Sequence, residues 1–130
     1  MNTRKTRKNK KCDVIQHFME MINTIKLYHW KTYSFPEHKN TDELHKSLNE
    51  HVDKFVEVML GKYGGRIDKR EFSFKCSNYS STNEIKKYIH KTLFYLSTFN
   101  HTFKNESDLL NIRDEMVADL NQFLYLLSFH

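Results

Sequence analysis

One stretch of the sequence carries imidazole and carboxylate side chains at spacings that suit metal binding. His38 and Asp42 are four residues apart, and so are Asp53 and Glu57, so that on a helix each pair projects to one side. Iron and similar metals accept such mixed sets of imidazole and carboxylate ligands. His29 lies upstream, at the end of an apolar stripe. These five residues are therefore the candidate metal ligands.

The two pairs cannot close one site within a single chain. On a helical wheel they fall within an arc of about 100° that points away from the apolar residues of the same segment. Asp42 and Asp53 are roughly 16 Å apart along a helix axis, whereas metal–ligand bonds are about 2 Å long. Two copies packed antiparallel about a two-fold axis bring His38 and Asp42 of one chain against Asp53 and Glu57 of the other. The same outward face carries two apolar residues, Val56 and Leu60.

Apolar residues recur at helical spacing in four segments. Serine and glutamate three residues apart, the spacing of a capping box, precede the second and third segments at Ser34 and Ser81. The predicted helices cover approximately residues 13–30, 35–61, 82–103 and 109–127. Residues 62–80 lose the periodicity and predict a crossover, with a short extended piece at residues 71–76.

Composition and connectivity together predict the fold class. A chain of 130 residues with one Pro and three Gly is long enough for one helical domain and too short for two. Four amphipathic helices with a long connection only between the second and third describe an all-α, four-helix ferritin-like bundle, and the pattern alone is compatible with other helical bundles. We expect this domain to span residues 12–130, after a disordered basic tail at residues 1–11.

The formal charge of +5 is concentrated in that tail. The rest of the chain is close to neutral. A basic tail can neutralise nucleic-acid phosphates, and it can equally serve as a solubilising or docking arm. The basic residues of the tail are Arg4, Lys5, Arg7, Lys8, Lys10 and Lys11.

Neither a secretory signal nor a membrane span is visible, because no apolar stretch follows the basic residues. Cys12 and Cys76 lack the spacing of a zinc site or a redox pair. We therefore expect a soluble, intracellular protein of the cytoplasm.

Several of these motifs resemble those of the Dps proteins, a branch of the ferritin-like superfamily. The specific matches are His29-Trp30, His38-x-x-x-Asp42 and Asp53-x-x-x-Glu57. Glu43-Leu44, Gly64-Gly65 and the C-terminal stretches 108–110 and 119–127 extend the likeness over roughly residues 12–130. The second-helix motif is also similar to that of small proteins of large DNA viruses, which would place the chain in host cytoplasm or a virion.

The resemblance implies an intersubunit di-iron ferroxidase centre. His29, His38 and Asp42 would come from one subunit and Asp53 and Glu57 from its neighbour. Ferrous iron would be oxidised, typically by hydrogen peroxide, with zinc or manganese as substitutes, and Trp30 would lie beside the site. Family members assemble as dodecamers, and some bind DNA through basic tails. The loop before His38 and the crossover are shorter here than is usual, which favours a homodimer over a cage.

Each residue also has a simpler reading. Taken singly, His29 is typical of a core histidine, and the carboxylates are typical of solvated surface residues. His45 is either an outer ligand or a surface histidine. The alternative function is a structural or DNA-associated protein, without catalysis, that keeps the bundle and the dimer.

Overall fold

The computed structural model describes the backbone of residues 3–129 and the side chains of residues 10–129. This part of the chain forms four long helices and one single turn, with no strand. The predicted all-α four-helix bundle is confirmed. The helices are α1 (Thr3–Lys31), α2 (Phe35–Tyr63), α3 (Thr82–Ser97), the short α4 (Phe99–Thr102) and α5 (Ser107–Leu127).

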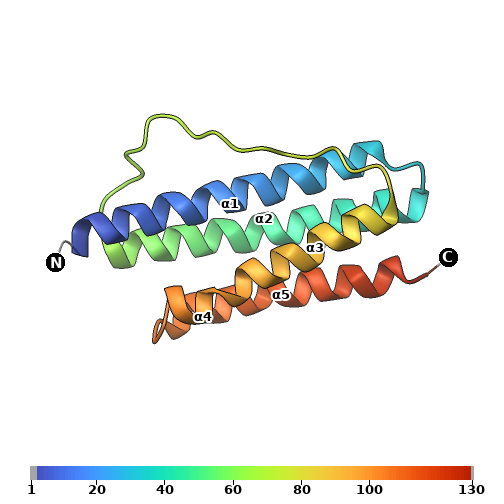
Figure 1. Ribbon diagram of the computed structural model, residues 1–130. Helices are drawn as coiled ribbons and strands as arrows, with labels where there is room; N and C mark the ends of the chain where they lie inside the picture. Colours follow the sequence, from blue (N-terminus) through green and yellow to red (C-terminus); the bar gives the residue numbers. More distant parts are fainter. Residues whose placement is uncertain (1–2, 130) are drawn as a thin grey trace.

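The order of the helices follows from one long connection. Helices α1 and α2 form an antiparallel pair joined by a short loop, and α2 packs against both α1 and α5 (Figure 1). The segment between α2 and α3 returns along the outer side of α1 to the far end of the bundle. As a result α3 runs parallel to α2, and α5 returns antiparallel to α3. This is the crossover that the sequence predicts.

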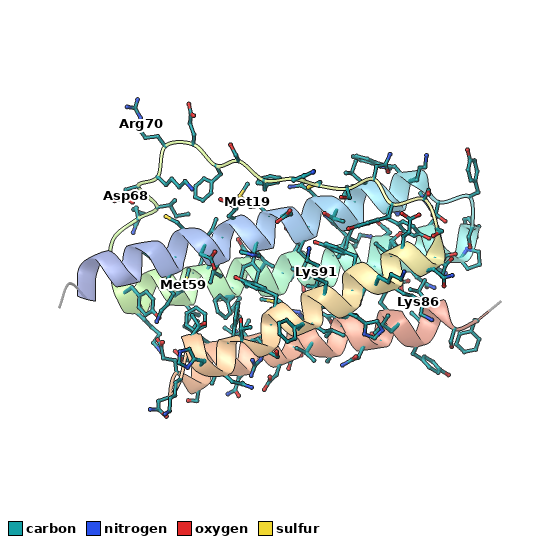
Figure 2. All side chains as sticks on the ribbon, viewed as in Figure 1. Met19, Met59, Asp68, Arg70, Lys86 and Lys91 are labelled. Atoms are coloured by element: carbon teal, nitrogen blue, oxygen red, sulfur yellow. The ribbon has the colours of Figure 1, made fainter. Side chains whose placement is uncertain are left out.

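Apolar residues at helical spacing fill the space between the helices (Figure 2). Phe55 of α2 is the centre of an aromatic cluster, with its ring 5.3 Å from the ring of Phe18, 5.5 Å from that of Phe99 and 5.3 Å from that of Phe103. All four rings are buried. Because Phe55 lies on the inner face of α2, the opposite face of the helix points away from the core.

Both ends of α2 are defined by their caps. The hydroxyl of Ser34 accepts from the backbone N–H of Glu37, as the capping box predicts. At the other end Gly64 adopts φ 80° and donates its backbone N–H to the carbonyl of Leu60 at 2.8 Å. The helix therefore ends at Tyr63, two residues beyond the predicted end.

Helix α1 begins at Thr3, so the backbone of the expected disordered tail is helical from that residue on. No glycine or proline interrupts these residues, and lysine and arginine are good helix formers. Lys10 also anchors the segment, since its Nζ lies 5.5 Å from the ring centre of Tyr63 and 5.2 Å from that of Phe103.

Two other segments differ from the prediction. The third helix breaks at Thr98, whose hydroxyl bonds to the carbonyl of Tyr95 at 2.6 Å and competes with the helical backbone pattern. Phe99 and Phe103 still reach the core, through α4 and the turn after it. Residues 71–76 form no strand. Within residues 3–129, no helix is both long enough and apolar enough to cross a membrane.

Candidate metal centre

His29 and His38 lie face to face where α1 meets the start of α2. Their ring centres are 3.9 Å apart and the ring planes differ by 16°. The Nδ1 of His29 is 2.7 Å from the backbone oxygen of His38, and the Nδ1 of His38 is 2.8 Å from the backbone oxygen of His29. A carbonyl oxygen can only accept, so both Nδ1 atoms carry the proton. When the rings are neutral, both Nε2 atoms keep a lone pair for a metal.

Thr41 supports this arrangement from the next turn of α2. Its hydroxyl is fully buried, lies 3.1 Å from the Nδ1 of His29 and is 2.7 Å from the carbonyl oxygen of Glu37, to which it donates. The N–H of His29 is thus shared between a carbonyl and a hydroxyl. Metal-binding histidines are commonly held in this way through the nitrogen that does not bind the metal.

Asp42 follows one turn after His38. Its carboxylate pairs with the ammonium of Lys46 at 3.2 Å, and this contact lowers the pKa of Asp42, with the charge of Lys26 adding to the effect. The carboxylate is therefore ionised and available, and in the single chain it is compensated by lysine.

Asp53 and Glu57 form the second pair, three turns further along α2. Both are exposed. A hydrogen bond between the two carboxyl groups raises the pKa of Glu57, because the neighbouring charge of Asp53 favours a shared proton. Two neighbouring carboxylates also suit a bound cation, whose positive charge relieves the repulsion between them.

The structure brings the five residues together as two groups and not as one. His29, His38 and Asp42 gather at the α1–α2 turn, while Asp53 and Glu57 lie further along α2. In the described part of one chain, no three histidine, cysteine or acidic side chains converge on a position for a metal. The five candidate ligands therefore lie in two separate groups on each chain.

His45 and Trp30 are close in sequence to the group formed by His29, His38 and Asp42. His45 is half-buried one turn after Asp42, and its pKa is lowered by burial and by the charge of Lys26. Lys26 itself lies over Trp30, with its Nζ 5.5 Å from the ring centre, and Trp30 is 68% exposed. An exposed tryptophan therefore stands one residue from His29.

One polar contact was not predicted from the sequence. The Nδ1 of His51 in α2 is 2.7 Å from Asp119 of α5, and Ser47 donates to the same carboxylate at 2.8 Å. Spacing along the sequence does not predict this contact, because His51 and Asp119 are 68 residues apart. His51 and Asp119 both lie on polar edges of their helices. That position is the only feature of the sequence that points to the contact.

The two basic residues of the tail whose side chains are described are engaged with the bundle. Lys10 donates to the hydroxyl of Tyr63, and Lys11 donates to the carbonyl of Gly64, both at 3.4 Å. The other four predicted nucleic-acid-binding side chains, those of Arg4, Lys5, Arg7 and Lys8, lie outside the described side chains.

Fold and site together define a four-helix bundle protein whose candidate metal ligands lie in two groups on α1 and α2. Comparison with known proteins places it further: the chain belongs to a family of unknown function, DUF5856, which matches residues 29–127. That match spans all five candidate ligands.

The chain is also similar to CX3CL1-binding protein 2 of Plasmodium falciparum (isolate 3D7), with 26% identity over 102 residues. The alignment covers 77% of this chain and 42% of that protein, so the chain corresponds to less than half of its relative's length. No solved structure matches.

Proposed function

We propose that this protein binds iron in the manner of Dps proteins, as a ferroxidase-type oxidoreductase whose centre is completed by two copies of the chain. One observation carries the proposal. His29 and His38 each donate Nδ1–H to the other's backbone carbonyl, which leaves both Nε2 atoms free. A structural role for two stacked histidines does not require that both rings hold the same tautomer.

The charges of the joined site fit two ferrous ions. Each site receives two neutral imidazoles and one carboxylate from the first chain and two carboxylates from the second. The three carboxylates bring three negative charges, and two divalent ions bring positive charge that compensates them. The loaded site therefore has little net charge. Imidazole with carboxylate is a ligand set that iron accepts.

In the proposed reaction iron is the substrate. Each of two ferrous ions gives up one electron, and the two electrons reduce one hydrogen peroxide molecule. The O–O bond breaks, and two protons complete two water molecules. The chain's own residues hold the two ions side by side, so that both electrons are delivered in one encounter.

The test is an anaerobic titration with ferrous iron, followed by peroxide and monitored by ultraviolet absorbance of ferric ion. We expect rapid oxidation by the parent protein and its loss in the Asp53→Ala, Glu57→Ala variant. A matched control, Glu71→Ala with Glu115→Ala, removes two exposed carboxylates away from the site. An unchanged rate in the first variant overturns the proposal.

Shielding of DNA is a second candidate function, supported by the basic composition of the first helical turns. Replacing Arg4, Lys5, Arg7 and Lys8 with glutamine tests it and leaves the contacts of Lys10 and Lys11 in place. If all four contact phosphates, the slope of log affinity against log salt decreases in magnitude by about 3 to 4. Equal slopes for the two proteins exclude a role for this segment.

A further inference from the structure

A cavity of about 260 Å³ lies between α1 and α3, and none of the candidate metal ligands lines it. Its lining comes from residues 17–21 of α1 and from residues 88–98, in α3 and at its C-cap. Phe18, Met21 and Leu96 are buried there and supply an apolar surface. Protein interiors rarely leave spaces larger than a water molecule, and an apolar cavity of about 150 Å³ already accommodates benzene. This cavity therefore has room for an apolar body of about two fused rings.

Two tyrosines of α3, two helical turns apart, bound the cavity and are held in place by other aromatic rings. The ring of Tyr95 stacks on that of His17, with the centres 4.0 Å apart, and meets the ring of Phe99 edge to face. The ring of Tyr88 lies 5.5 Å from that of Tyr79 in the crossover segment. All these contacts are made within the chain, so the walls need little further ordering when a ligand binds, which lowers the entropic cost of binding.

Opposite charges stand on the two sides of the opening. Glu20 of α1 and Lys91 of α3 both line the cavity, and in the described part of the chain neither forms an ion pair or a side-chain hydrogen bond. Burial is the largest cause that raises the pKa of Tyr88, and the charge of Glu20 adds to it, which places this carboxylate near the Tyr88 end. Lys91 (Figure 2) follows Tyr88 by three residues on the facing helix. A carboxylate and an ammonium group are thus both available at one opening.

We propose that this cavity binds a small zwitterion with an aromatic body, in the size and charge class of a free aromatic amino acid. The aromatic body fills the apolar space, the ligand's ammonium group pairs with Glu20, and its carboxylate pairs with Lys91. Phe94 of α3 also lines the cavity and is 74% exposed, so its ring is free to stack on the bound one. The site shares no residue with the candidate metal centre, and the inference does not depend on iron chemistry.

The charges at the opening select this class of ligand over its nearest alternatives. A purely apolar ligand of the same size gains nothing from Glu20 or Lys91. An aromatic acid pairs with Lys91 but brings its own negative charge close to Glu20, and an aromatic amine has the opposite disadvantage at Lys91. An aromatic residue inside a peptide carries neither charge on its own backbone. Only a ligand with both charges beside the ring satisfies both side chains.

The test is a titration of the full chain with L-tryptophan, followed by nuclear magnetic resonance. Three comparison probes keep the indole ring: tryptamine has only the ammonium group, indole-3-propionate has only the carboxylate, and N-acetyl-tryptophanamide has neither. Glu20→Gln and Lys91→Gln each remove one charge from the opening. The matched control, Glu115→Gln with Lys104→Gln, removes one charge of each sign from exposed positions outside the cavity. Circular dichroism confirms that each variant is helical.

We expect L-tryptophan to bind most tightly of the four probes, with saturable shifts at the residues that line the cavity. Glu20→Gln weakens the binding of L-tryptophan and tryptamine by about two- to fivefold, the range for an exposed ion pair, and does not weaken that of indole-3-propionate. Lys91→Gln weakens the binding of L-tryptophan and indole-3-propionate and spares tryptamine. Phe94→Ser, at an exposed position, weakens the binding of every probe.

Three results overturn the proposal. The first is the absence of saturable shifts at the cavity. The second is binding of N-acetyl-tryptophanamide as tight as that of L-tryptophan, which points instead to an aromatic residue of a peptide. The third is a loss of affinity in Glu20→Gln and Lys91→Gln that is the same for every probe, because recognition of the two charges requires that the losses differ. Iron oxidation is measured separately, and its presence or absence changes none of these outcomes.

Discussion

If the iron centre is shared between two chains, two inactive variants restore activity when they are mixed. The first variant removes the histidine half of the site, with His38→Ala and Asp42→Ala. The second removes the acidic half, with Asp53→Ala and Glu57→Ala. Neither forms an intact site with itself, because every site in its own dimer lacks one half.

The size of the recovery follows from two-fold symmetry. A mixed dimer contains one site built from the two damaged halves and one built from the two intact halves. Random exchange of equal amounts gives about half mixed dimers, and half of their sites are intact, so the mixture recovers about one quarter of the parent's sites. A site closed within one chain gives no recovery at any ratio.

The assay measures ferrous iron bound per chain and the rate of its oxidation after the two variants are mixed under conditions that allow subunit exchange. Donor dye on one variant and acceptor dye on the other, attached at their chain ends, report by energy transfer whether exchange is complete. The control mixes each variant with itself. Complete exchange without recovered binding refutes the shared site, even if the parent protein oxidises iron.

Three further predictions concern the bundle. Phe55→Ala removes the centre of the buried aromatic cluster and lowers the free energy of unfolding by about 3–5 kcal/mol, which urea denaturation measures. Arg113→Met leaves the carbonyl of Leu96 and the amide oxygen of Asn100 without their donor, which lowers the free energy of unfolding by about 3 kcal/mol. A decrease below about 1 kcal/mol, the upper end for an exposed ion pair, contradicts this view. Burial is the largest cause that raises the pKa of Tyr28 and of Tyr88 to about 12. The unfolded chain releases these protons first, because its tyrosines have the ordinary pKa. The stability that the two tyrosines contribute is therefore fully present below pH 10 and is lost as the pH rises to about 12. Denaturation curves, measured together with tyrosinate absorbance, check this.

The helices and their buried faces could be predicted because their signals are local. Ser34 and Gly64 mark the ends of α2 through hydrogen bonds within a few residues. The stripe of α5 from Leu109 to Leu127 is buried as its spacing predicts. The predicted start of the first helix, near residue 13, differs from the observed start at Thr3, because the charge of this segment suggests a disordered tail. The segment contains no helix breaker, and Lys10 contacts Tyr63, which both favour the helix.

The candidate ligands could be predicted from the sequence, but the hydrogen bonds that hold them in place could not. Spacing along α2 grouped His38 with Asp42 and Asp53 with Glu57. Spacing carries no information on backbone acceptors, so the exchange of hydrogen bonds between His29 and His38 appears only in three dimensions. The same holds for Thr41, whose sequence position gives no hint that its buried hydroxyl reaches His29.

Each half of the candidate site has a charged neighbour in the single chain, and this bears on when metal binds. Lys46 pairs with Asp42, and the neighbouring carboxyl of Asp53 raises the pKa of Glu57. A cation that meets one half alone either displaces the lysine from Asp42 or finds only two carboxylates, and so gains few ligands. When two chains meet, the same displacement provides ligands from both, so binding of metal and association of the chains are linked free energies. If the site is shared as proposed, iron tightens the dimer by the same factor as dimer formation tightens iron binding, and a dimer whose affinity is unchanged by iron contradicts a shared site.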